Sequence, residues 1–126
     1  MRALLPLAFL AVAACGDNGC VNDVQDEVIS PEGAKRAVLF GRRCGGDDGF
    51  VSHVSIIDPR DTLAGEGNVL VLSADSAADA ASGGPWVEAE WTDDLALTIR
   101  HAANARVRVK HAEVSDVAVT VEAVAR

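Results

Sequence analysis

Apolar and polar residues alternate along the second half of the chain, as in β-strands with one buried and one exposed face. Four stretches share this alternation: VEAEWT (87–92), LALTIR (95–100), RVRVKH (106–111) and DVAVTVEAV (116–124). Asp93 and Asp94 separate the first two stretches and predict the turn of a hairpin. The apolar members are expected to face a core, and they are Val87, Ala89, Trp91, Leu95, Leu97, Ile99, Val107, Val109, Val117, Val119 and Val121.

The first half of the chain carries strand signals that turn residues interrupt. SPEG (30–33) is typical of a tight turn, because Pro31 suits its second position. The strands expected in this half lie at 24–29, 34–40, 50–58 and 68–74. The last of them is a short continuous apolar run of the kind that buried strands have. The small and polar residues 75–85 predict an exposed loop.

Together these elements predict an all-β fold, because no stretch sustains a helical period. The chain has 126 residues, which is enough for one domain with a modest core. We expect a single small domain of about seven to eight antiparallel strands in sequential hairpins, arranged as a meander or a sandwich.

The N-terminus has the layout of a secretory signal: a positively charged start, an apolar stretch and then small residues. VAAC (12–15) resembles the lipobox of bacterial lipoproteins. The resemblance implies cleavage between Ala14 and Cys15 and lipidation of the Cys15 thiol. It also implies an outer-membrane destination, since Gly16 follows the cysteine. The alternative is an ordinary signal peptide cut after Ala13.

This resemblance sets the expected organisation of the chain. Residues 1–14 are a signal peptide, residues 15–22 are the lipidated cysteine and its tether, and residues 23–126 are the β-domain. The expected location is the bacterial cell envelope, with the domain anchored through Cys15 in the outer membrane and facing the periplasm or the exterior. The expected partners are therefore the membrane and an envelope protein.

The chain has three cysteines, and lipidation of Cys15 would leave Cys20 and Cys44 as a pair. Exported proteins occupy an oxidising compartment in which disulfides persist. We therefore expect a Cys20–Cys44 bridge, which would stabilise the fold by about 3.5 kcal/mol through loop closure.

The stretch VISPEGAKRAVLFGRRCG and the later GFVSHVSI (both within 28–56) resemble a group of small bacterial proteins, many of them lipoproteins. Their pattern runs SPDG, a strand, CGATTGF and then S-T-x-V-S-I. The family has no established activity, so the resemblance implies no catalytic residues. This chain departs from the pattern at residues 46–48, where it has Gly-Asp-Asp in place of Ala-Thr-Thr.

The formal net charge is −8, which argues against binding to nucleic acid. Three basic residues alternate along one predicted strand: Arg106, Arg108 and Lys110. They would either bind an acidic partner or pair with glutamates of neighbouring strands, namely Glu88, Glu90 or Glu122.

The chemistry-bearing residues form no complete catalytic or cofactor motif, so we expect no catalytic residue and no cofactor. Asp47 and Asp48 are weak candidates for a Ca²⁺ site, because calcium loops space their ligands at alternate positions. His53, His101 and His111 would form a Zn²⁺ site only if three strands brought them together.

We therefore expect a non-enzymatic, lipid-anchored envelope protein that acts as an interaction or structural module. Two alternatives stay open. One is a periplasmic module that binds a small ligand near Trp86 or Trp91, or a metal. The other is an enzyme of unknown class.

Overall fold

The computed structural model describes residues 19–44, 51–73 and 84–125. Within these ranges the chain forms a single small all-β domain, as predicted, with nine strands. The strands are β1 (Val21–Ile29), β2 (Arg36–Arg43), β3 (Val51–Ile57), β4 (Leu70–Ser73), β5 (Val87–Asp93), β6 (Ala96–Ala102), β7 (Arg106–Lys110), β8 (Glu113–Val114) and β9 (Val117–Val124). In this part of the chain, no helix has the length and apolar character needed to cross a membrane.

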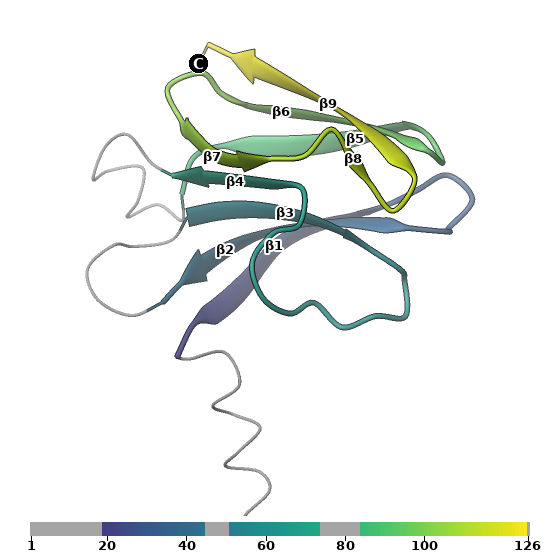
Figure 1. Ribbon diagram of the computed structural model, residues 1–126, viewed down its shortest axis with the longest axis horizontal. Coiled ribbons are helices and arrows are strands. Elements are labelled where there is room, and N and C mark those ends of the chain that lie inside the picture. The colour runs from purple at the N-terminus through teal and green to yellow at the C-terminus, as the bar shows by residue number, and fades with distance from the viewer. Residues whose placement is uncertain (1–18, 45–50, 74–83, 126) are drawn as a thin grey trace, which may run out of the picture.

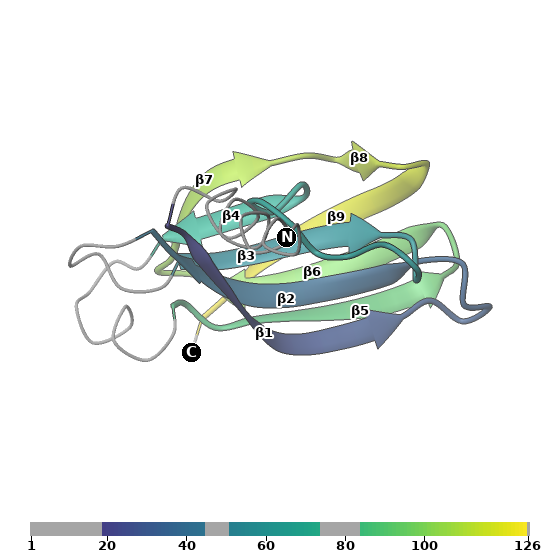
Figure 2. The same ribbon diagram turned by 90° about the horizontal axis from the view of Figure 1, so that it is seen from below.

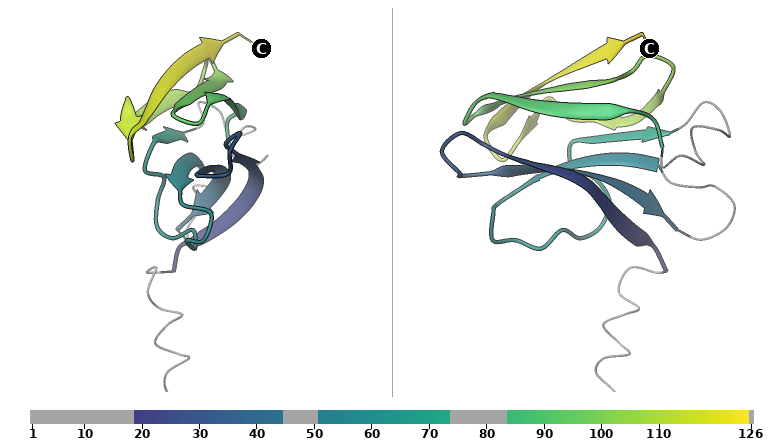
Figure 3. Two further views of the ribbon diagram at one scale, coloured as in Figure 1. Left: turned by 90° about the vertical axis from the view of Figure 1, so that its right-hand side faces the viewer. Right: turned by 180° about the vertical axis from the view of Figure 1, so that it is seen from behind.

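The strands form two sheets that lie one over the other (Figures 1 and 3). The five-stranded sheet has the order β1-β2-β3-β4-β7, and the four-stranded sheet has the order β5-β6-β9-β8. On one side of the sandwich, the indole Nε1 of Trp91 in β5 donates a hydrogen bond of 2.8 Å to the carbonyl oxygen of Val28 in β1. On the other side, the chain leaves the five-stranded sheet after β7 and joins the four-stranded sheet through β8 and β9 (Figure 2).

The core lies between the two sheets and is built from the inward positions of both. Its buried members are Ala37, Leu39, Val54, Ile56, Val69, Leu70, Leu72, Leu97, Ile99 and Val117. Val87, Ala89 and Trp91 pack against it as predicted from the alternation in β5, and so do Val119 and Val121 in β9. The period-two pattern therefore identified the inner face of the four-stranded sheet.

The prediction of sequential antiparallel hairpins is wrong for one central pair, because β6 and β9 are parallel. After β6 the chain leaves the four-stranded sheet and forms β7 beside β4 in the other sheet. It then returns and aligns β9 with β6, for example Ile99 opposite Val121. Parallel neighbours require such a crossover connection, which no local pattern reveals.

The β5–β6 turn lies one residue later than predicted. Asp93 belongs to β5 and lies opposite Ala96, so the turn is formed by Asp94 and Leu95. Asp93 Oδ1 accepts a hydrogen bond of 2.8 Å from the Leu95 amide, a local bond that favours turns. Leu95 is consequently 56% exposed instead of facing the core.

The predicted SPEG turn joins β1 to β2, and the Gly33 amide donates to the Ser30 carbonyl at 2.8 Å. Gly33 has a φ of +81°, which glycine adopts without steric cost. The Glu32 amide in this turn donates to Asp94 Oδ1 at 2.9 Å. This bond joins the turns of the two sheets at the same end of the sandwich.

β3 is buried on both of its faces. Val54 and Ile56 belong to the core, whereas His53 and Ser55 lie on the outer face. Residues 58–69 connect β3 to β4 and form the connecting segment that covers these two side chains (Figure 1). The Asn68 amide donates to Ser55 Oγ at 3.0 Å, while Asn68 Oδ1 accepts from the Ile56 amide at 2.9 Å. The connecting segment therefore satisfies the polar groups that this burial removes from water.

Gly67 is the point at which the connecting segment comes closest to the sheet. A Cβ at this position would lie 2.8 Å from the carbonyl oxygens of Leu70 and Val54 and 2.9 Å from the Val54 amide nitrogen. These neighbours are backbone atoms, so they cannot move aside as a flexible side chain would.

We expect Gly67→Ala to lower the free energy of unfolding by about 2 kcal/mol, because the added methyl group must displace β3 or the connecting segment. Urea denaturation followed by circular dichroism measures the change. Ala64→Ser, at an exposed position of the same segment, is the control and should leave the midpoint unchanged. Equal midpoints for the wild type and Gly67→Ala would contradict this close packing.

Candidate functional site

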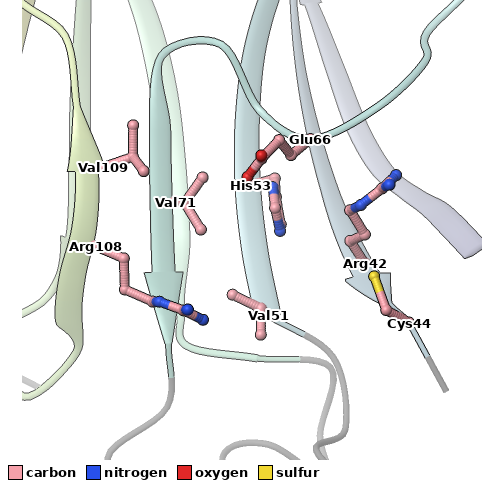
Figure 4. Close-up of a pocket in the computed structure, with 8 residues that line it drawn as sticks. All are labelled: Arg42, Cys44, Val51, His53, Glu66, Val71, Arg108 and Val109. Atoms are coloured by element: carbon pink, nitrogen blue, oxygen red, sulfur yellow. The ribbon is translucent and has the colours of Figure 1, made fainter. Parts of the chain in front are cut away.

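A hollow of about 440 Å³ lies on the outer face of the five-stranded sheet (Figure 4). It spans the end at which β2 finishes and β3 begins, and it extends over β4 to β7. Its lining residues are Arg42, Cys44, Val51, His53, Glu66, Val71, Arg108 and Val109. The hollow therefore combines an apolar floor of valines with charged groups from three separate segments.

His53 is the central polar group of the hollow. The Gly67 amide donates a hydrogen bond of 2.9 Å to its Nδ1, and the ring stacks on Phe40 with the centroids 5.2 Å apart. An Nδ1 that accepts a hydrogen bond carries no proton, so the neutral ring has its proton on Nε2. Figure 4 shows one ring nitrogen on the Glu66 side and the other turned towards Val51.

The surroundings of His53 favour its neutral form. Burial, and after it the positive charges of Arg42 and Arg108, together lower the pKa of His53 from 6.5 to about 4. Protonation would also turn Nδ1 into a donor facing the Gly67 amide, which would break their hydrogen bond. His53 is therefore an uncharged hydrogen-bond donor, through Nε2, near neutral pH.

Arg42 forms the wall of the hollow on the β2 side. Its guanidinium donates a hydrogen bond of 2.7 Å to Asn22 Oδ1 on β1, and the Asn22 amide group donates in turn to the Gly65 carbonyl at 3.0 Å. Arg42 is thus held between the first strand and the connecting segment. It contributes positive potential to the hollow from a fixed position.

Arg108 reaches the hollow because β7 contains a bulge. Val107 lies opposite Leu72 and Val109 lies opposite Val71, so Arg108 is an extra residue in the ladder. Arg108 and Val109 consequently both line the hollow. The prediction that both valines of β7 face the core is wrong, since Val109 lies on the outer face and Val107 is 43% exposed.

The register of β7 also divides the predicted basic stripe. Arg106 lies opposite Ser73, whereas Lys110 lies opposite Leu70. Ser73 and Leu70 are three positions apart on β4, and side chains at that spacing point to opposite faces. The stripe is therefore no continuous surface, and only Arg108 of its members lines the hollow.

The glutamates that were expected to pair with the stripe instead surround Arg100 of β6. Its guanidinium lies 3.3 Å from Glu88, 3.1 Å from Glu90 and 3.2 Å from Glu122. The hydrogen bonds to Glu90 and then Glu88 raise the pKa of Arg100 above its ordinary value. Arg108 lies on β7, which belongs to the other sheet.

The predicted bridge between Cys20 and Cys44 is present. It links the residue before β1 to the residue after β2, at the end of the sandwich where the hollow lies. Val21 lies opposite Arg43 directly beyond it. The bridge therefore fixes the open end of the β1–β2 pair beside Arg42.

The remaining predicted site residues do not come together. Cys15, Asp47 and Asp48 lie outside the described residues. Within the described residues, no group of three or more histidine, cysteine or acidic side chains is placed to hold a metal ion. His101 is buried in β6, and the exposed His111 follows β7, so neither of them joins His53.

Ser52 and His53 point to opposite faces of β3, as their adjacent positions predict. Ser52 Oγ donates a hydrogen bond of 2.7 Å to the Pro85 carbonyl between the sheets. His53 lies on the outer face with Gly67. The two side chains therefore form no serine–histidine relay.

Comparison with protein-family models, curated proteins and solved structures found no match to this chain.

We expect the stability of the protein to fall as the pH drops from about 6.5 towards 4 because of His53. In this window the unfolded chain binds a proton that the folded chain does not, which favours unfolding. Between pH 7 and pH 5 the free energy of unfolding should fall by about 2 kcal/mol more for the wild type than for His53→Asn. Asparagine keeps an acceptor for the Gly67 amide but does not titrate. Urea titrations at both pH values measure this difference, and parallel losses in the two proteins would contradict the assignment.

Proposed function

We propose that this protein is a lipid-anchored, non-enzymatic module of the bacterial cell envelope. The observation that carries the proposal is the Cys20–Cys44 bridge. It pairs the two cysteines that lipidation of Cys15 would leave, so that all three cysteines of the chain have a role. A disulfide in a small domain is typical of proteins exported to an oxidising compartment.

The position of the bridge fits a short tether. Only residues 16–19 separate Cys15 from Cys20, and a chain of that length spans at most roughly 17 Å when fully extended. Cys20 is bonded to Cys44, which lines the hollow. An anchor at Cys15 would therefore hold the end of the domain that carries the hollow close to the membrane surface.

The chemistry of the hollow supports a binding role over a catalytic one. His53 Nδ1, the nitrogen that could accept a proton, is already bonded to the Gly67 amide. With a pKa of about 4, the ring is a weak base at neutral pH. A general base works best with a pKa near the operating pH, so His53 fits the role of a donor that orients a bound group.

Intact mass spectrometry of the protein extracted from envelopes tests this proposal. We expect a chain that begins at Cys15 and carries acyl chains, and whose mass rises by two hydrogen atoms upon reduction. A Cys15→Ala variant is the control and should lose the acyl mass but keep the bridge. Recovery of the wild type without acyl mass, in the aqueous phase of a detergent partition, would overturn the anchor.

A further inference from the structure

We propose that the hollow on the outer face of the five-stranded sheet binds a small organic anion. Its carboxylate or phosphate group would lie between Arg108 and the Nε2–H of His53, and its apolar part would cover the valine floor. This inference goes beyond the proposed anchoring, and its main test does not depend on the anchor.

The first support is that the two arginines of the hollow are not neutralised by an ion pair with a described residue. Within residues 19–44, 51–73 and 84–125, the ion pairs of the chain involve Lys35, Arg36 and Arg100. Arg42 and Arg108 have no carboxylate partner in these ranges. Arg42 donates one hydrogen bond to Asn22, which leaves other N–H groups of its guanidinium available.

The second support is that both arginines act on the same point of the hollow. Each contributes to the lowered pKa of His53, so the imidazole lies in the positive field of both. Figure 4 shows the Arg108 guanidinium extending towards Val51, on the side to which the free imidazole nitrogen turns. An anion bound there would meet a guanidinium and a neutral N–H donor, which is a favourable charge-assisted arrangement.

The third support is the floor. Val51, Val71 and Val109 come from three different strands and place apolar surface beside the donors. A hollow of about 440 Å³ has the size of small-molecule sites, which combine apolar walls with a few polar groups that fix orientation. An anion with a short alkyl or aromatic part fits this composition better than a bare inorganic ion.

Among the described lining residues, Glu66 is the one that carries a carboxylate, and its removal provides a second test with the opposite expected effect. It lies at the connecting segment, on the opposite side of His53 from Val51 (Figure 4). Its charge opposes any bound anion, so removal of that charge should strengthen binding. Loss of the Arg108 charge should weaken binding, and the two variants therefore move the affinity in opposite directions.

The test is a titration of the processed protein, in detergent, with hexanoate and with hexyl phosphate. Binding is monitored by NMR through the ¹H–¹⁵N signals of Gly67 and Val71 and the imidazole signals of His53. We expect saturable shifts, a rise in the pKa of His53 upon saturation, and no binding of hexanol. Arg108→Gln should raise Kd by about fivefold and Glu66→Gln should lower it. Lys110→Gln removes the same charge from β7 outside the hollow and is the matched control, with an unchanged Kd.

The hollow would be rejected as an anion site by any of three results. These are the absence of saturable shifts, equal binding of hexanol and hexanoate, and equal weakening by Arg108→Gln and Lys110→Gln. The amide spectrum reports whether each variant is folded. If Arg108→Gln does not fold, the opposite effect of Glu66→Gln still decides the outcome.

A second arm distinguishes a free anion from a lipid headgroup, which share this chemistry. The protein is placed in vesicles of phosphatidylcholine alone or with phosphatidylglycerol. A headgroup would be identified if the His53 signals move towards their hexanoate-bound positions only in the phosphatidylglycerol vesicles. The Arg108→Gln variant should not show this movement. Unchanged signals together with binding of soluble hexanoate would identify a free anion. The soluble arm remains valid if the anchor at Cys15 proves absent.

Discussion

Burial of β3 on both faces is the constraint on which the rest of this structure depends. A half-exposed strand needs apolar side chains on one face only, but β3 places His53 and Ser55 under the connecting segment 58–69. Buried polar groups are costly unless they are hydrogen-bonded. The backbone N–H groups of Gly67 and Asn68 supply these bonds. The connecting segment is therefore held against β3 at these two residues.

The hollow exists because this cover is incomplete. The segment crosses β3 at Gly67 and turns back into the sheet at Val69, whose amide donates to the Val54 carbonyl at 3.0 Å. The outer face beyond that crossing keeps Val51, Val71 and one edge of His53 at the hollow. The same hydrogen bond that fixes the segment also fixes the tautomer of the imidazole. The contact between Gly67 and His53 therefore contributes both to the fold and to the chemistry of the hollow.

Most of the features that the sequence predicted depend on neighbouring residues, and the disulfide is the exception. The alternation in β5 and β9 identified their inner faces, SPEG marked the β1–β2 turn, and counting of cysteines identified the bridge. The β5–β6 turn was misplaced by one residue, because the pair Asp93–Asp94 does not show that Asp93 ends the strand and also accepts the hydrogen bond of the turn.

The features that the sequence did not predict are those that depend on pairing between distant strands. The parallel alignment of β9 with β6 follows from the crossover through β7, which has no local signal. The hollow was missed for the same reason, since its residues come from β2, β3, β4, β7 and the connecting segment. His53 was considered with the other histidines as a metal ligand, and the serines beside it gave no sign that the strand would be covered on both faces.

The bulge in β7 links the protection of a sheet edge to the composition of the hollow. β7 is the outer strand of its sheet, and such edges need devices that discourage pairing with other chains. Charged side chains and bulges are two of these devices, and β7 has both. A regular strand would have placed Arg108 on the face opposite to Arg42 and His53, so the edge would have been charged but the hollow would have lacked its second cation. One inserted residue thus interrupts the ladder and, by the same displacement, brings a guanidinium onto the valine floor.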